Sequence, residues 1–110
     1  MKHIRQEMYD DFVNEVKMIY LDNLQAIILF GSVARGTATE ESDLDIAILV
    51  NSDDRLMYDK LLDVVVKMDL DNDVVISTTV IEKEQFDTWK DVLPFYKNIN
   101  KEGIQLWEAA

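Results

Sequence analysis

The sequence predicts a small α/β protein of the α+β type, in which helices flank a mixed β-sheet. Three observations predict it: apolar residues recur at four-residue spacing in the first twenty residues, three short apolar runs follow, and only three glycines and one proline interrupt the chain. The expected order is helix, strand, strand, helix, strand, helix. A doubly wound parallel sheet is less favoured, because about twelve residues separate the first two strands, too few for a helical crossover.

The first predicted helix covers residues 1–20 and has one apolar stripe that a sheet can bury. The stripe consists of Ile4, Met8, Phe12, Val16 and Ile19. The apolar run 25–30 is short enough for a buried strand, and a polar, glycine-containing segment at 31–42 separates it from a second strand over 43–50. The first half of the chain therefore supplies one helix and two strands.

The second half of the chain alternates helix and strand. A helix is predicted over 53–68, because Ser52 or Asp53 can cap it and apolar residues recur on one face. A third strand is predicted over 73–81, where β-branched residues are frequent. The remaining elements are a short helix at 82–89, a helix from Pro94 to about Lys101 with Gly103 as its stop, and a short strand at 104–107.

Length and composition exclude several classes of protein. The chain has 110 residues, so we expect a single domain over 1–110. Its formal charge of −11 argues against direct binding of nucleic acid phosphates. Cysteine is absent and His3 is the single histidine, which excludes thiol nucleophiles and multi-histidine metal sites. No apolar run approaches the ~18 residues of a membrane span, so we expect a cytoplasmic protein that binds no membrane.

Two aspartates on the second predicted strand are the first functional signal. Because strand side chains alternate between faces, Asp43 and Asp45 share one face, with Cα atoms about 6.6 Å apart. Carboxylates this close repel each other, and a divalent cation such as Mg²⁺ reverses the repulsion. Asp73, at the start of the third strand, completes a three-carboxylate cluster if that strand lies beside the second, and such a cluster suits two Mg²⁺ ions in phosphoryl transfer. A plainer interpretation stays open, in which Asp43 starts a strand, Asp45 is partly exposed and Asp73 is loop charge.

The glycine and serine that end the first strand are the second signal. Gly31 lets a ligand approach the backbone, and Ser32 can cap a helical turn whose N–H groups bind phosphate. Arg35 follows within one turn and can meet a phosphate or pair with the carboxylates. An ordinary strand-to-helix turn explains the same residues and stays open. A P-loop does not fit, because Thr37-Ala38 stands where Lys-Ser/Thr is required.

The string LFGSVARGTATEESDLDIAILV, residues 29–50, resembles the nucleotidyltransferase superfamily that includes DNA polymerase beta, and above all its minimal nucleotidyltransferases from bacteria and archaea. The matching residues are Gly31-Ser32, Arg35-Gly36, Ser42, Asp43-x-Asp45, Asp73-Val-Val-Ile and the tail from Phe95 to Ile104. The resemblance implies the small mixed sheet of that fold. It also implies ATP held on two Mg²⁺ ions by Asp43, Asp45 and Asp73, with Gly31 and Ser32 at the β- and γ-phosphates and with Arg35 and Ser42 as further nucleotide- or phosphate-binding residues. In this family Asp73 would help to deprotonate the attacking hydroxyl.

The minimal nucleotidyltransferases resemble antitoxins paired with HEPN-domain ribonuclease toxins. The resemblance therefore implies that this chain transfers AMP from ATP to a tyrosine of a HEPN toxin, and its acidic surface would suit a basic partner. Two alternatives stay open. One is an antitoxin that neutralises its partner by contact alone. The other is a nucleotidyltransferase that modifies a small molecule such as an aminoglycoside, with the acceptor cleft at the interface of a homo-oligomer.

Overall fold

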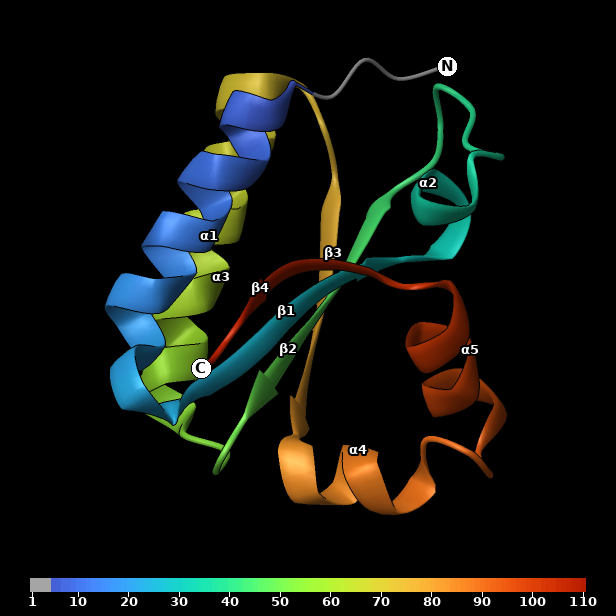
Figure 1. Ribbon diagram of the computed structural model, residues 1–110. Helices are drawn as coiled ribbons and strands as arrows, with labels where there is room; N and C mark the ends of the chain where they lie inside the picture. Colours follow the sequence, from blue (N-terminus) through green and yellow to red (C-terminus); the bar gives the residue numbers. More distant parts are fainter. Residues whose placement is uncertain (1–4) are drawn as a thin grey trace.

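The computed structural model describes residues 5–110 and contains a four-stranded mixed sheet with the order β3-β2-β1-β4 (Figure 1). The strands are β1 (Leu24–Phe30), β2 (Leu44–Val50), β3 (Ile76–Glu82) and β4 (Ile104–Glu108). β1 is antiparallel to both β2 and β4, whereas β2 and β3 are parallel. The predicted α/β class with a small mixed sheet is confirmed. His3 and Ile4, the single histidine and the first residue of the predicted apolar stripe, lie outside the described residues.

Helices cover both faces of the sheet (Figure 1). α1 (Gln6–Tyr20) and α3 (Arg55–Asn72) lie side by side on one face. α4 (Lys83–Trp89) and α5 (Pro94–Glu102) pack on the other. The remaining elements are a 3₁₀ turn at Leu21–Asn23 and the short helix α2 (Gly31–Arg35). Among residues 5–110, no helix combines the length and the apolar character needed to cross a bilayer.

The alternation of side chains in β2 builds two separate cores. Leu44, Ile46 and Ile48 point to α1 and α3, and each is fully buried. Ala47 and Leu49 point the other way and pack with side chains of α4 and α5. Because helices cover both faces, β2 is an almost continuous apolar run, and this makes a half-buried aspartate on it unusual.

The boundaries of α3 differ from the prediction at both ends. Asp54, rather than Ser52 or Asp53, caps the helix, since its Oδ1 accepts a hydrogen bond of 3.0 Å from the Met57 N–H. At the other end, the helix continues through Asn72. β3 consequently starts three residues later than the strand predicted from residue 73, and this shift changes the functional site.

Candidate active site

The end of β1 and the start of β2 meet beside α2. The antiparallel register sets Phe30 opposite Asp45, so Gly31 lies next to the Asp45 carboxylate. A β-carbon added at Gly31 would collide with Oδ2 of Asp45, and the φ of Gly31, +76°, lies in the left-handed region. Both constraints require glycine here. Glycine at this position lets the backbone at the start of α2 lie in close contact with the Asp45 carboxylate.

Asp43 and Asp45 lie close together, as predicted. Asp43 is exposed and directly precedes β2, and Asp45 is half-buried on the strand. Burial raises the pKa of Asp45 above its ordinary value of 3.8, the charge of Asp43 raises this pKa further, and the charge of Arg35 lowers it. The pair therefore concentrates negative charge that a bound cation would relieve.

Asp73 does not join this pair. It ends α3 with a left-handed φ of 51°, and β3 begins three residues later. The parallel register of β2 and β3 sets Ser77 opposite Asp45. Asp73 instead lines a groove with Glu40 and Glu41.

In the described structure, the predicted cluster of three carboxylates is therefore not formed, and the role of Asp73 as a third metal ligand stays a prediction. Within residues 5–110, no three His, Asp or Glu side chains are grouped to hold a metal ion. The physical reason is the longer α3, which keeps Asp73 at a helix end. β3 offers the exposed Ser77 to this face of the sheet instead. Ser77 could not be identified from the sequence, because only the strand register places it opposite Asp45.

The start of α2 presents polar groups beside the carboxylates. No side chain caps its first turn, so its first N–H groups are open to an anion. The Ser32 C=O accepts a hydrogen bond of 2.9 Å from the Thr37 N–H, and α2 ends at Gly36 with φ +78°. In the described part of the chain, the Ser32 hydroxyl makes no hydrogen bond and is available to a ligand. This arrangement is consistent with the phosphate-binding role predicted for Gly31 and Ser32, which stays a prediction.

Arg35 and Ser42 both have protein partners. Arg35 Nη1 lies 3.2 Å from Oε2 of Glu102 on α5, although its charge still lowers the pKa of Asp45. The Ser42 Oγ accepts a hydrogen bond of 2.9 Å from the Thr39 N–H and stabilises the loop before β2. The phosphate contacts expected of Arg35 and Ser42 therefore stay predictions. A ligand would have to compete with Glu102 for Arg35.

Aromatic side chains from α5 form one wall beside the site. The rings of Phe30 and Phe95 meet edge to face at 5.6 Å, and Phe95 contacts Tyr96 at 6.0 Å. Phe95 is 46% exposed although it lies next to the last residue of β1. Sequence patterns alone gave Phe95 no site role, and the one available signal was an aromatic pair directly after the helix-starting Pro94.

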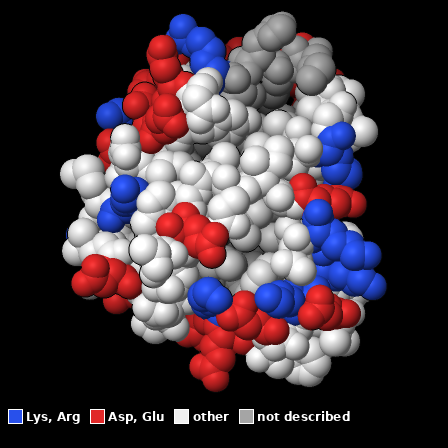
Figure 2. Space-filling view, in the orientation of Figure 1, with Lys and Arg blue, Asp and Glu red and all other residues white. Residues whose placement is uncertain are grey.

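Charge is distributed unevenly around the site. The segment 83–102, which carries α4 and α5, has four lysines and four acidic residues, so the net charge of −11 resides in the rest of the chain. In the view of Figure 2, blue side chains gather over α4 and α5. The site opens on the face of the sheet that carries these helices, where an anionic ligand meets the least repulsion.

Comparison with known proteins identifies the family. A model of the nucleotidyltransferase domain matches residues 10–106. A Methanocaldococcus jannaschii protein, provisionally named a protein adenylyltransferase, is 39% identical over 97 residues, which cover 88% of this chain and 92% of the relative. A second protein of that organism with the same provisional name is 36% identical, over 70% of this chain and 79% of its own length.

Solved structures share the fold at lower identity. A toxin–antitoxin structure with AMP-PNP aligns with a TM-score of 0.60 at 22% identity, over 91% of this chain and 73% of the solved chain. A structure of a tri-AMPylated Shewanella oneidensis HEPN toxin in complex with an MNT antitoxin gives a TM-score of 0.55 at 19% identity, over 96% and 74%. The sequence match and the shared fold agree: the chain belongs to the nucleotidyltransferase domain family and is a nucleotidyltransferase.

Proposed function

We propose that this chain transfers AMP from Mg²⁺-bound ATP to a tyrosine hydroxyl of a HEPN-domain toxin and acts as the antitoxin of that pair. The observation that carries the proposal is the contact between Gly31 and Asp45, because it joins a phosphate-binding turn to a metal-binding pair. Relatives provisionally named protein adenylyltransferases support the reaction. Neighbouring structures that contain AMP-PNP or an AMPylated HEPN toxin support the nucleotide and the partner.

Asp43 and Asp45 fit one Mg²⁺ that arrives with the nucleotide. This ion is commonly held by one or two carboxylates, with phosphate oxygens and water as its other ligands. The exposed Asp43 and the half-buried Asp45 supply two carboxylates for this ion. When bound, the ion would neutralise charge on the triphosphate and polarise the phosphorus under attack. The second ion expected from the sequence has no third carboxylate to hold it among residues 5–110.

The protein groups around this pair would position the triphosphate. The open N–H groups of α2 and the Ser32 hydroxyl would bind phosphate oxygens, and Gly31 leaves room for them next to Asp45. The tyrosine oxygen then bonds to the α-phosphorus, the bond from that phosphorus to the oxygen bridging the β-phosphate breaks, and pyrophosphate leaves. The phenol proton passes to the exposed rim of the site, where Asp43 can accept it.

Labelling of a HEPN-domain protein encoded beside this chain tests the proposal. With ATP radiolabelled at the α-phosphate and Mg²⁺, the partner should become labelled, and a tyrosine-to-phenylalanine variant of the partner should not. Asp43→Asn with Asp45→Asn should abolish the labelling, since both side chains keep their size and lose their charge. The matched control is Asp63→Asn, an acidic residue on α3 outside the site. Equal labelling by the site variant and the control would refute the proposal.

Neutralisation by contact alone is the second candidate, favoured by the absence of a third carboxylate from the site within residues 5–110. It predicts that the Asp43→Asn and Asp45→Asn double variant still protects cells that express the toxin. Catalytic neutralisation predicts that the same variant binds the toxin but no longer protects. Measuring binding and protection on one variant therefore separates the two candidates.

A further inference from the structure

In the described part of the chain, the outer edge of β3 carries no neighbouring strand. The order β3-β2-β1-β4 places β3 at an end of the sheet. Leu44 donates its N–H to the Val75 C=O at 2.8 Å, which shows that the odd-numbered residues of this segment turn their backbone groups toward β2. The backbone N–H and C=O groups of Thr78 and Val80 therefore point outward, away from β2. These outward groups have no hydrogen-bond partner within the described chain.

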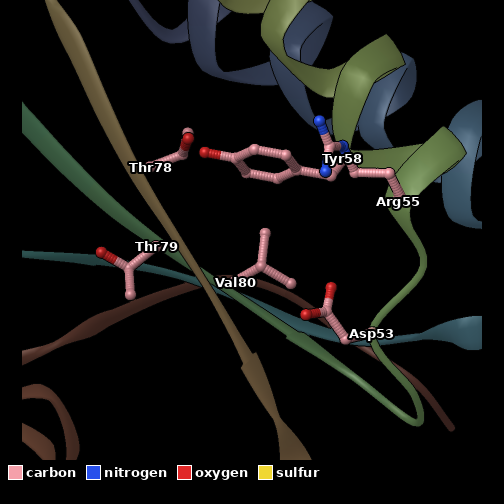
Figure 3. A pocket seen from close by; sticks show the side chains of 6 residues that line it. All are labelled: Asp53, Arg55, Tyr58, Thr78, Thr79 and Val80. Carbon is pink, nitrogen blue, oxygen red and sulfur yellow. The ribbon is translucent and has the colours of Figure 1, made fainter.

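The side of α3 that faces this edge forms a groove with it. The groove has a volume of about 560 Å³, and Figure 3 shows Tyr58 reaching from α3 toward Thr78, with Val80 below the ring. Arg55 and Asp53 line the same groove near the start of α3. A side chain on an added strand would therefore meet an aromatic ring as well as the strand edge.

An apolar line continues along α3 from this groove. Near the carboxyl end of α3, Oδ1 of Asp69 accepts a hydrogen bond of 2.9 Å from the Ile76 N–H. The side of α3 that carries Tyr58 and Asp69 therefore lies beside β3 at both ends. Between Tyr58 and Asp69, helical spacing places Leu62 and Val66 on the same line. Leu62 is 39% exposed and Val66 57% exposed, so both present apolar surface beside the open edge.

β3 lacks the features that usually block an open edge. Edge strands are commonly protected by lysine, proline, a bulge or short length. β3 has seven residues, ISTTVIE, with no proline, a single charge at its last residue, and a regular register with β2. The opposite edge, β4, has five residues and an irregular register. The two edges therefore differ in their capacity to accept a strand.

The charged residues around β3 indicate which kind of segment fits its edge. Acidic residues lie at both ends of β3, with Asp53 and Glu82 near its carboxyl end and Asp69 and Asp73 near its amino end. A second copy of this chain pairing antiparallel along β3 would set acidic ends against acidic ends, and the charges would repel. An extended segment with basic residues at its ends and small β-branched residues between them matches both the charge and the edge.

We propose that the edge of β3 accepts an extended segment of a basic partner protein as a fifth strand. Alternate residues of that segment would exchange backbone hydrogen bonds with Thr78 and Val80. Its side chains on the helical side would pack on Tyr58, Leu62 and Val66. This binding site is separate from Asp43 and Asp45, so the proposal does not depend on the nucleotidyltransferase reaction.

Hydrogen exchange measured by NMR on the whole chain tests the proposal. The probe is a synthetic peptide with a Val-Thr-Val-Thr-Val centre and two lysines at each end. With this peptide, exchange of the Thr78 and Val80 amides should slow by about tenfold or more, because both become hydrogen-bonded. A control peptide, N-methylated at the residues that would face β3, should leave the exchange of both amides unchanged. Unchanged exchange with the first peptide, or equal protection by both peptides, would overturn the proposal.

A pair of variants tests the apolar line without touching the sheet. Val66→Glu should weaken peptide binding at least tenfold, even though its added negative charge attracts lysine. Leu56→Glu adds the same charge to the same helix at a residue that is 73% exposed and lies off the line, two positions before Tyr58, and should bind as the unmodified chain does. Equal peptide binding by the two variants would refute the proposed packing of the peptide on Val66. Protection of Thr78 and Val80 by self-association, without peptide, would refute the choice of a basic partner.

Discussion

Substitution of Gly31 gives the sharpest test of the site geometry, because a matched control exists at Gly36. Both glycines have left-handed backbones, with φ of +76° and +78°. A β-carbon at Gly31 would collide with Oδ2 of Asp45 and lie 3.1 Å from its Cγ and 3.3 Å from its Cβ, whereas a β-carbon at Gly36 meets nothing within 4 Å. Gly31→Ala thus adds backbone strain and a displaced carboxylate, and Gly36→Ala adds backbone strain alone.

The expected magnitudes follow from these contacts. A left-handed alanine costs about 1–2 kcal/mol, so both variants should lose that free energy of unfolding. In Gly31→Ala the whole Asp45 carboxylate must also move by about 1 Å to restore ordinary contact distances. A displacement of that size at a reacting centre typically lowers the rate about 100-fold.

Denaturant unfolding and the rate of AMP transfer, measured on both variants, check this reasoning. Gly36→Ala should lose stability and keep its rate when assayed below its unfolding transition. Gly31→Ala should lose both stability and rate. A Gly31→Ala protein with the rate of Gly36→Ala would show that the contact with Asp45 does not position the reacting groups.

Four further substitutions test other parts of the structure. Asp45→Asn should abolish AMP transfer, whereas Asp73→Asn should keep the rate within about twofold, because asparagine tolerates a left-handed φ and Asp73 lies outside the site. In denaturant unfolding at several pH values, Asp45→Asn should also be more stable than the wild type at neutral pH. This difference should vanish as the pH falls through the raised pKa of Asp45 toward 3.8, because the wild-type carboxyl then becomes neutral as well. Tyr20→Phe should stabilise the fold by about 1 kcal/mol, because in the described structure the buried Tyr20 hydroxyl has no hydrogen-bond partner. Burial raises the pKa of Tyr20 to about 12 while an unfolded tyrosine ionises near 10, so wild-type stability should fall between pH 10 and 12, and fall less in Tyr20→Phe. Asp54→Ala should lower the free energy of unfolding by about 1 kcal/mol, because it removes the cap of α3.

Local patterns were sufficient to predict much of the sheet and part of the site. Alternation along β2 separates buried aliphatic residues from Asp43 and Asp45, and this period of two does not depend on tertiary structure. Gly31 was identifiable because a polar, glycine-led segment interrupts an apolar run abruptly. Its contact with Asp45 then follows from the antiparallel pairing of two neighbouring strands.

The end of α3 and the role of Asp73 could not be predicted in the same way. Residues 69–73 are mostly acidic, and such residues occur both in exposed helical turns and in loops. The helix continues beyond Met68, which packs in the core, and ends only where Asp73 adopts a left-handed conformation, and neither feature is visible in a local pattern. Ser77 faces the site only because the parallel register of β2 and β3 places it there.

Transfer of radiolabel from ATP to the HEPN partner tests the central claim most directly, if it is measured separately with the label at the α-phosphate and at the γ-phosphate. A nucleotidyltransferase that uses Asp43 and Asp45 should transfer the α-label and release the γ-label in pyrophosphate. Transfer of the γ-label, or no transfer of either label in the presence of Mg²⁺, would contradict the account.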